Sequence, residues 1–245
     1  MNLKTATKKS RSIPAFFIFD FFLTYRLSSP KRKEVTKKMK NDNLLKRLWL
    51  VVSNKNDRSG VALKEVDGTD LIVKLAVKED GKIRQIKDSE MKELRMTRGE
   101  LFKEALDNLR SDGYDLRPLS EVLDTYDPTG ILYLSKSGGE GSSLILDKNV
   151  LQQASERIGS YFILPVSVDE LLLVPKSSGF TAKDLSYELD EINRLIPAEK
   201  RLSNQVYEYS FSKRKITKPM LEKEEVEQAQ VSLEQETVST HMGRI

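Results

Sequence analysis

Hydrophobic residues are concentrated in short runs between residues 44 and 211, and their spacing predicts both strands and helices. The most apolar stretch is Tyr161–Val174 (YFILPVSVDELLLV), where two aliphatic runs flank Pro165 and a polar step at 166–170. Runs of four or five β-branched and aliphatic residues beside prolines are typical of buried strands. Because proline lacks the amide that a central strand donates, we expect Pro165 to end the first strand.

Further apolar runs predict four more strands, at Leu71–Val77, Ile131–Leu134, Leu144–Leu146 and Val206–Phe211. The last alternates aromatic with polar residues, which predicts an edge strand with one wet face. The glycine-rich segment Ser135–Ser143 is predicted to be a hairpin loop between the second and third of these strands. A phosphate-binding loop is the alternative, and it is disfavoured because it requires GxxxxGK[ST] directly before a helix.

Three segments carry apolar residues at helical spacing, and residues at their ends carry capping signals. The predicted helices cover 97–109, 149–158 and 181–196. Thr97 with Glu100 forms a capping-box pattern, Thr181 with Asp184 begins the third helix in the same way, and Asp147 caps the second.

Together these elements predict one α+β domain, over residues 44–212, with a mainly antiparallel sheet covered by the amphipathic helices. The flanking segments differ from it in composition. Residues 213–245 are charged and predicted to be partly helical or disordered, because they hold too few apolar residues for a core of their own. Residues 1–43 are basic, and five of the nine phenylalanines lie between Phe16 and Phe22.

The extension 1–43 has three interpretations. It is disordered, or sequence upstream of a natural start at Met39, or an anchor that holds Phe16–Phe22 at a membrane surface. Its apolar run, of about a dozen residues and broken by Asp20, is shorter than a bilayer requires. Export is the least favoured alternative, since no small-residue cleavage site follows.

The distribution of charge along the chain bears on whether the folded domain binds nucleic acid. The whole chain has a net charge of +4, but residues 1–43 hold 11 basic and 3 acidic residues. This leaves 30 basic against 34 acidic residues in 44–245, a net charge of −4. The basicity therefore belongs to the extension, and nucleic-acid binding by the folded domain is not expected.

Several kinds of active site are excluded by composition. The sequence has no cysteine, and its one histidine is His241. Thiolate nucleophiles and Cys-ligated zinc therefore lack their residues, and an HExxH zinc site lacks its second histidine. A Ser-His-Asp triad would depend on His241 near the C-terminus and is not expected. We predict no catalytic residue, no metal site and no cofactor, and the lack of cysteine is compatible with the cytoplasm.

The best candidate pocket lies where the two strands of the central stretch meet. Its residues are Ser167, Asp169, Glu170 and, in the following helix, Asn193. In a strand, adjacent Asp169 and Glu170 point to opposite faces and form no carboxylate pair unless a turn intervenes. Ser167 has no histidine or lysine nearby to activate it. A structural role for these residues is therefore favoured over a reactive one.

Several motifs occur in order along residues 70–211: DLIVKLAV, MTRGELFKEALDNL, ILYLSKSGGEGSSLILDKNVLQQASERIG, YFILPVSVDELLLVP, Asn193 and LSNQVYEY. In these motifs the chain resembles a bacterial family of unknown function found in Gram-positive gut bacteria and their mobile elements. In that family the step after the proline tends to read Ser-Ser-x-His-Glu, whereas Asp169 stands here in place of the histidine. The replacement argues against His-dependent chemistry in this chain. The resemblance implies a fold and a bacterial origin, and it implies no activity.

Three functions stay open. The favoured one is a non-catalytic cytoplasmic accessory or regulatory protein that binds another protein. The second is a hydrolase-like enzyme built on Ser167, Asp169 and Glu170, with or without a metal. The third is a nucleic-acid-associated factor that uses the basic extension. The first is favoured because no residue activates a nucleophile and the acidic body disfavours DNA.

Overall fold

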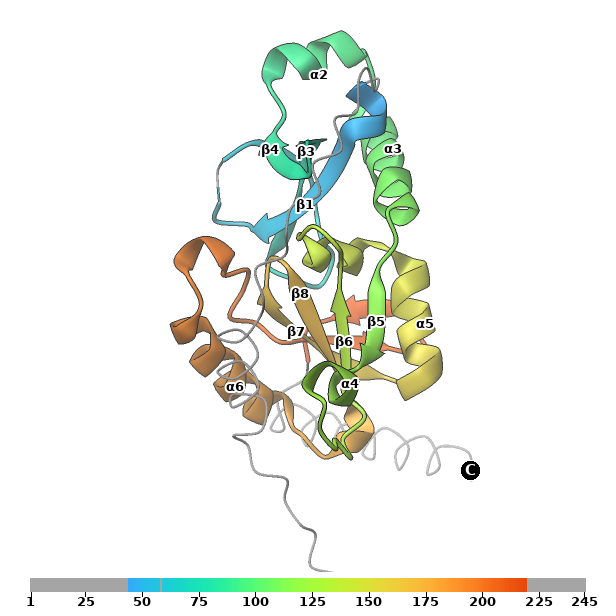
Figure 1. The fold of residues 1–245 in the computed structure, drawn as a ribbon, viewed down its shortest axis with the longest axis vertical. Helices are drawn as coiled ribbons and strands as arrows, with labels where there is room; N and C mark the ends of the chain where they lie inside the picture. The colour runs from blue at the N-terminus through green and yellow to red at the C-terminus, as the bar shows by residue number, and fades with distance from the viewer. Residues whose placement is uncertain (1–43, 58, 220–245) are drawn as a thin grey trace, which may run out of the picture.

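The computed structural model describes residues 44–57 and 59–219 of the chain. Within them the strands form two antiparallel sheets with helices packed around them (Figure 1). The predicted α+β fold with antiparallel pairing is therefore confirmed. That the strands divide over two sheets is not evident from the sequence pattern. The smaller sheet lies in the upper part of Figure 1 and the larger one below it.

The smaller sheet is organised around its longest strand. It contains β1 (Leu48–Asn54), β2 (Val61–Glu65), β3 (Leu71–Glu79) and β4 (Lys82–Gln85). β1 pairs along one edge of β3, while β2 and β4 follow one another along the opposite edge. Residues 73–77 of β3 are buried on both faces, as expected for a central strand. Lys74 is the one charged residue in that run, and only 6% of it is exposed.

The larger sheet has the strand order β10-β9-β7-β8-β6-β5. Its strands are β5 (Asp115–Pro118), β6 (Leu132–Ser135), β7 (Tyr161–Ser167), β8 (Glu170–Pro175), β9 (Tyr207–Ser210) and β10 (Lys215–Thr217). The predicted edge position of β9 is wrong, because β10 pairs with its outer side. β10 also lies beyond residue 212, where the sequence suggested that the charged tail begins.

Pro165 does not end its strand, which corrects the prediction. β7 continues to Ser167, and the register with β8 shifts between Leu164 and Ser167. On its other side β7 pairs with β9 only at Tyr161–Ile163. Pro165 therefore lies where neither ladder requires its missing amide, a position that proline tolerates inside a sheet.

The glycine-rich segment leads into a 3-10 helix, so the prediction of a strand at Leu144–Leu146 is wrong. This helix, η2, spans Gly141–Leu146, and most of its residues are buried. The Ser143 hydroxyl donates to the carbonyl of Leu50 in β1, at 2.7 Å. The apolar residues 144–146 thus meet the core from a helical turn, which buries side chains as effectively as a strand does.

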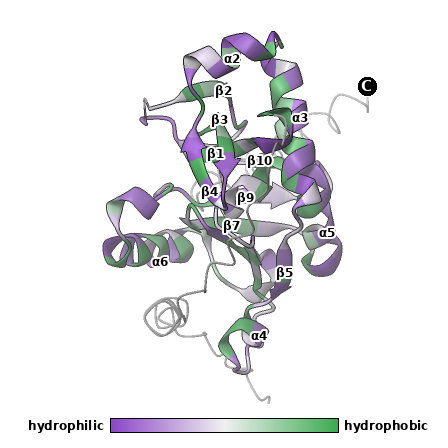
Figure 2. Cartoon of the chain, turned by 45° about the horizontal axis from the view of Figure 1, so that its top comes forward, coloured by the Kyte–Doolittle hydropathy of each residue, from purple (hydrophilic) through white to green (hydrophobic). Residues whose placement is uncertain are grey.

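The helix caps predicted at Thr97, Asp147 and Thr181 are confirmed. The remaining helices are α2 (Asp88–Leu94), α3 (Arg98–Ser111), α4 (Leu119–Leu123), α5 (Lys148–Ile158) and α6 (Ala182–Leu195), with short 3-10 turns η1 (Leu44–Arg47), η3 (Lys176–Ser178) and η4 (Ala198–Lys200). Thr97 and Thr181 form the two expected capping boxes, and Asp147 accepts from the Asn149 amide. In Figure 2, α5 and α6 each show a hydrophobic and a hydrophilic side.

Apolar side chains form two core clusters on either side of the larger sheet. The first joins the smaller sheet, α3 and α5 to one face of the larger sheet. The second lies between its other face and α4 and α6. Since β7 and β8 contribute to both clusters, the central stretch is buried on both faces.

A buried lysine connects the two sheets. Lys136 directly follows β6, and its ammonium donates to the carbonyls of Leu109 and Gly113 at the end of α3, at 3.0 and 2.6 Å. It also lies 5.1 Å from the ring centre of Trp49 in β1. A cation at a helix C-terminus offsets the partial negative charge of the last carbonyls. Burial lowers the pKa of this ammonium, although Asp112 beside it opposes the change.

Two predictions about the extensions remain open. The membrane-surface prediction for Phe16–Phe22 falls outside the described residues, as does most of the tail. The division of the chain at residues 43 and 212 likewise stays a prediction. Within the part of the chain that the structure describes, no helix combines the length and apolar character needed to cross a membrane.

We expect Lys136→Ala to lower the free energy of unfolding by about 2 to 4 kcal/mol, because it leaves two carbonyls without their donor and removes a buried charge contact. Urea denaturation followed by circular dichroism measures the change. Lys148→Ala, at an exposed lysine on α5, is the control and should change stability by less than about 0.5 kcal/mol. A loss at Lys136 no larger than the control would contradict this role.

Candidate functional site

The tight turn between β7 and β8 holds three of the four sequence-predicted pocket residues. The Ser167 hydroxyl donates to the Glu170 carboxylate at 3.3 Å and accepts from the Asp169 amide at 3.1 Å. The second oxygen of Glu170 accepts from the Tyr133 hydroxyl at 2.7 Å. The turn thus brings Ser167, Asp169 and Glu170 together, but it directs their polar groups into internal hydrogen bonds.

Ser167 lacks the surroundings of a nucleophile. Its side chain is fully buried, and its hydroxyl is engaged both as donor and as acceptor. A serine nucleophile requires a base within hydrogen-bond reach and space for a substrate carbonyl. Glu170 could accept the proton, but Tyr133 already holds that carboxylate on its other side. The arrangement shapes a turn and offers no reacting group to solvent.

Asp169 holds neighbouring segments against the turn. Its carboxylate accepts from the Glu140 backbone amide at 3.3 Å and forms an ion pair with Lys200 of η4 at 2.9 Å. The Val168 amide also donates to the Lys200 carbonyl at 3.0 Å. Asp169 therefore fixes the position of Glu140, at the end of the glycine-rich segment, with respect to the larger sheet.

Gly141 explains why that segment contains glycine. A Cβ atom at this position would lie 2.2 Å from the Asp169 carbonyl oxygen and 2.9 Å from the Lys136 amide nitrogen. Real side chains do not approach a backbone so closely, so only glycine fits. The Ser142 hydroxyl then donates to the Val168 carbonyl at 2.8 Å. The glycine permits close packing on the turn, in place of the phosphate cradle considered from the sequence.

Asn193, the fourth predicted residue, lies elsewhere. Its side-chain amide donates to the Ser203 carbonyl at 2.9 Å and to the Asn204 side chain at 2.8 Å. Ser203 in turn donates to Asp70, which also accepts from Tyr207 of β9 and from Asn54 of β1. Asn193 therefore supports a buried polar network between the two sheets, apart from the Ser167 turn.

A pocket of about 180 Å³ opens on the smaller sheet beside this turn. Buried residues of β3 line it, together with the exposed residues Asp57, Ser59 and Gly60 and with β4, where Ile83 and Arg84 are half-buried and Gln85 is exposed. Glu140 lines it from the larger sheet's side, and Ser53 lines it from β1. The pocket is therefore shared between the smaller sheet and the segment that Asp169 positions.

The side chain of Glu140 lacks the hydrogen bonds of the other carboxylates. Its Oε2 atom is buried and has no hydrogen-bond partner among the described residues. Burial, with a contribution from the neighbouring Asp169 carboxylate, raises the pKa of Glu140 to about 7, against the opposing effect of Lys200. Its backbone is also left-handed, with φ of 59°, which is uncommon outside glycine. Such unsatisfied and strained residues concentrate at functional sites.

No described residues gather into a group of three or more His, Cys, Asp or Glu side chains that could hold a metal ion. Asp169 and Glu170 contact different partners, so they do not act as a chelating pair. The chemistry that the site supports is recognition by hydrogen bonds and charge, at the pocket that Glu140 and Ser53 line.

Sequence reasoning missed the pocket residues Ser53, Lys74 and Glu140. For Lys74 a signal exists, because a lysine inside the apolar run LIVKLAV must be paired if the strand is buried. For Glu140 and Ser53 no local signal exists. A glutamate in a glycine-rich segment reads as solvent-exposed until the close approach at Gly141 is known.

Residues 42–211 match the model of a family described as a family of unknown function, DUF5688. This accords with the uncharacterised domain implied by the resemblance. Searches of curated proteins and of solved structures find no match.

We expect Gly141→Ala to destabilise the fold by more than about 2 kcal/mol, because the added methyl group overlaps the Asp169 carbonyl and forces the segment away from the turn. Gly99→Ala is the matched control. It lies in α3 with its nearest contact at 4.0 Å, and should stabilise by about 0.5 to 1 kcal/mol. Thermal unfolding measures both, and equal effects would contradict the packing argument.

Glu140 should make stability depend on pH. Because its pKa is higher in the folded state than the ordinary value of 4.5, the folded protein binds this proton more tightly. Its contribution is complete below about pH 4.5 and is lost as the pH rises through about 7. Over that range wild-type protein should lose up to about 3 kcal/mol relative to Glu140→Gln.

Urea titrations at pH 5, 6, 7 and 8 measure this difference between wild-type protein and Glu140→Gln. Glu93→Gln, at an exposed glutamate of α2, is the control and should follow wild-type protein at each pH. If wild-type protein and Glu140→Gln keep a constant separation across the range, Glu140 does not titrate with the raised pKa.

Proposed function

The chain belongs to the family of unknown function DUF5688, and we propose that it acts without catalysis, as an accessory or regulatory protein that binds an acidic segment of another protein. The surface proposed for this contact is the α2 face, which consists of Met91, Lys92, Leu94, Arg95, Met96 and Arg98. The single observation that carries the proposal is the combination, on this face, of half-exposed apolar side chains with cations that have no partner.

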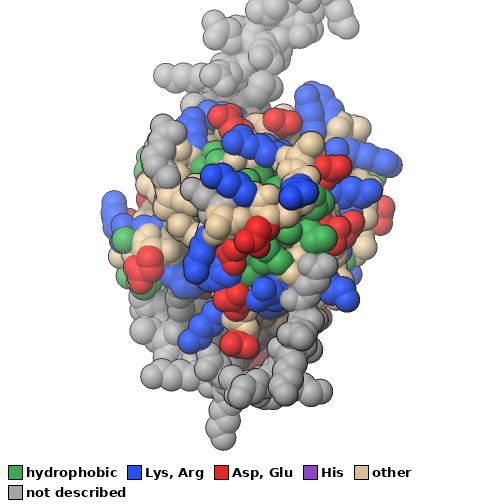
Figure 3. Space-filling view, turned by 90° about the horizontal axis from the view of Figure 1, so that it is seen from above, with side chains coloured by type: hydrophobic (Ala, Val, Ile, Leu, Met, Phe, Trp, Pro, Cys, Tyr) green, Lys and Arg blue, Asp and Glu red, His purple; other side chains and the backbone are tan. Residues whose placement is uncertain are grey.

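The apolar centre of the α2 face is formed by Met91, Leu94 and Met96. Each is partly buried against the first core cluster and partly open to solvent. Figure 3, seen from the α2 end of the molecule, has hydrophobic side chains surrounded by charged ones. An apolar centre with a polar rim is the usual anatomy of a protein interface, where methionine and arginine are enriched.

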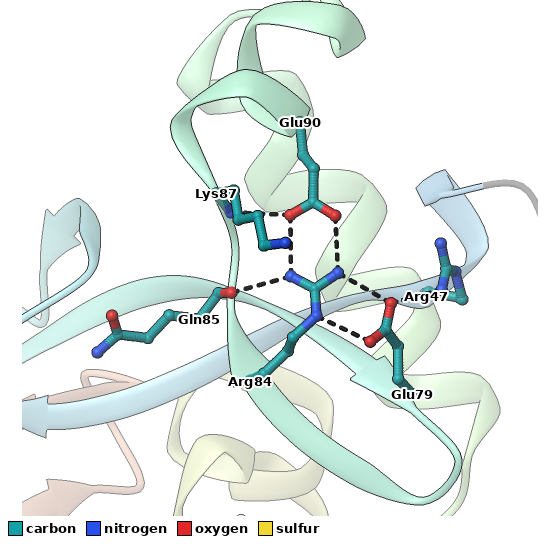
Figure 4. A network of polar contacts seen from close by, with 6 residues as sticks. All are labelled: Arg47, Glu79, Arg84, Gln85, Lys87 and Glu90. Atoms are coloured by element: carbon teal, nitrogen blue, oxygen red, sulfur yellow. Dashed lines mark hydrogen bonds and ion pairs between the residues drawn. The ribbon is translucent and has the colours of Figure 1, made fainter.

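The charge of the rim favours an acidic partner. The side chains of Lys92, Arg95 and Arg98 are exposed and make no hydrogen bond or ion pair with the described residues. Of the nearby acids, Glu90 is held by Arg84 and Glu100 caps α3, whereas Glu93 is exposed and offsets one of the three cations. Arg84 of β4 binds Glu79 of β3 as well as Glu90 of α2, so it joins the smaller sheet to α2 (Figure 4). Exposed cations beside an apolar patch attract a carboxylate-bearing segment and orient it.

A nucleic acid fits this face less well. Acidic side chains lie among the basic ones around it, and the methionines at its centre cannot pair with phosphate groups, which bind Lys and Arg. A hydrolase-like activity lacks support from Ser167, which is buried and doubly hydrogen-bonded. The proposal therefore keeps protein binding as the function.

The proposal also places the protein in the cytoplasm of a Gram-positive gut bacterium, with its gene on a mobile element. The resemblance of residues 70–211 to a family from such bacteria supports this origin. Sequencing the genomic neighbourhood and fractionating the source cells would test it, and a gene set among housekeeping genes or a protein found outside the cytoplasm would count against it.

We expect Lys92→Glu with Arg98→Glu to abolish partner binding, because the reversed charges repel an acidic segment. The tagged full chain is cross-linked in a lysate of its source organism, and the captured protein is purified and rebound in vitro. The double variant should bind that protein at least about tenfold more weakly, and wild-type binding should weaken as salt rises.

The control carries the same charge change elsewhere. Lys148→Glu with Lys183→Glu alters exposed lysines on α5 and α6 and should bind like wild-type protein. The proposal is overturned if both double variants lose binding equally, if nuclease treatment removes the captured molecule, or if no captured protein rebinds in purified form.

A further inference from the structure

The pocket beside Glu140 has an uneven distribution of free hydrogen-bonding groups. Its cations are already satisfied. Lys74 pairs with Asp57 at 2.5 Å and donates to the Ser59 hydroxyl at 3.2 Å. Arg84 uses each of its guanidinium nitrogens on Glu79, Glu90 or the Gln85 carbonyl. An anionic ligand would therefore find no unoccupied guanidinium donor and would compete with Asp57 for Lys74.

The acceptors of the pocket are not satisfied. Glu140 Oε2 and Ser53 Oγ are both buried, and both are without a hydrogen-bond partner among the described residues. Ser53 lies in β1 of the smaller sheet and Glu140 in the segment that follows β6 of the larger sheet, yet both residues line this one pocket. Glu140 is also the one charged residue of the lining that forms no ion pair with a described residue. A buried carboxylate without a partner is costly, which makes it a strong site for a cation.

We propose that this pocket binds a small aliphatic molecule with a primary ammonium group, which donates to the Glu140 carboxylate and the Ser53 hydroxyl. This site is separate from the α2 face and does not depend on the proposed protein partner. An ammonium supplies three donors on a compact positive charge, which matches one carboxylate and one hydroxyl.

The lining disfavours a metal ion and a large ligand. One carboxylate and one hydroxyl are too few oxygen ligands for Ca²⁺ or Mg²⁺, which take about six or more. The volume of about 180 Å³ is below the roughly 300–1,000 Å³ of pockets for drug-sized molecules. Val51, Ala76 and Ile83 add apolar walls. These features suit a short hydrocarbon chain that ends in an ammonium.

Titration of the ¹⁵N-labelled full chain with n-butylammonium chloride tests the site by NMR. We expect saturable shifts of the Ser53, Lys74 and Glu140 amides. Sodium butyrate and 1-butanol, which share the chain but lack the ammonium, should produce none at the same concentrations. Arms with 1,4-diaminobutane and with L-lysine distinguish a free diamine from an amino acid as the natural source of the group.

Substitutions separate the site from nonspecific binding to surface acids. Glu140→Gln keeps the shape of the side chain and should weaken n-butylammonium binding at least about tenfold, and Ser53→Ala about threefold to tenfold. Glu93→Gln should have no effect. The proposal is overturned if butyrate shifts the same amides, if Glu140→Gln binds like wild-type protein, or if the shifts follow exposed carboxylates across the surface.

The pH dependence gives an independent readout. Since the ammonium binds the ionised carboxylate, and the pKa of Glu140 is raised to about 7, affinity should increase roughly tenfold between pH 6 and pH 8. Asp169 and Lys200 face Glu140 on one side, and the ion-paired Lys74, Asp57 and Arg84 face it across the pocket. An affinity that does not vary over this range overturns the assignment to Glu140.

Discussion

The contact of the glycine-rich segment with the β7–β8 turn determines how the two sheets are held together. Gly141 lies against the Asp169 carbonyl so closely that no side chain fits between them. On either side of this contact, Lys136 reaches the end of α3 and Ser143 reaches β1. One segment of eight residues, 136–143, therefore connects the larger sheet to α3 and to β1 of the smaller sheet. The close packing at Gly141 leaves no space for a side chain, so the segment tolerates little change in conformation there.

The same contact explains why the charged groups near the turn differ in their environment. Asp169 and Glu170 have hydrogen-bond partners, because the turn forms around their carboxylates. Glu140 lines the pocket because its backbone amide and Gly141 are held against Asp169. Its side-chain Oε2 atom gains no hydrogen bond from the described residues in return. Its raised pKa is the electrostatic consequence of this position. Asp169 and Glu170 therefore stabilise the turn, whereas Glu140 Oε2 has no hydrogen-bond partner among the described residues.

The α2 face and the pocket use the smaller sheet in two different ways. The face is held by Arg84 of β4, which binds Glu90 of α2 and Glu79 of β3. The pocket lies on the same sheet, and Arg84 is part of its lining. The guanidinium donors of Arg84 are occupied by Glu79, Glu90 and the Gln85 carbonyl. A ligand in the pocket therefore has to be recognised by the acceptors of Glu140 and Ser53.

The helix starts and the fold class could be predicted from the sequence, because they depend on residues close together in the chain. Thr97 with Glu100, Thr181 with Asp184 and Asp147 each define a helix start, because a cap satisfies amides within one turn of itself. The antiparallel α+β class follows from the same local periodicities. The course of the chain at Pro165 and at residues 144–146, and the residues that line the pocket, depend on tertiary contacts. Pro165 continues a strand because both partner ladders are interrupted there, and residues 144–146 form a 3-10 helix because Gly141 docks on the turn. Ser53 and Glu140 lie 87 positions apart in the chain and line one pocket because two sheets meet, a long-range contact that no local pattern records.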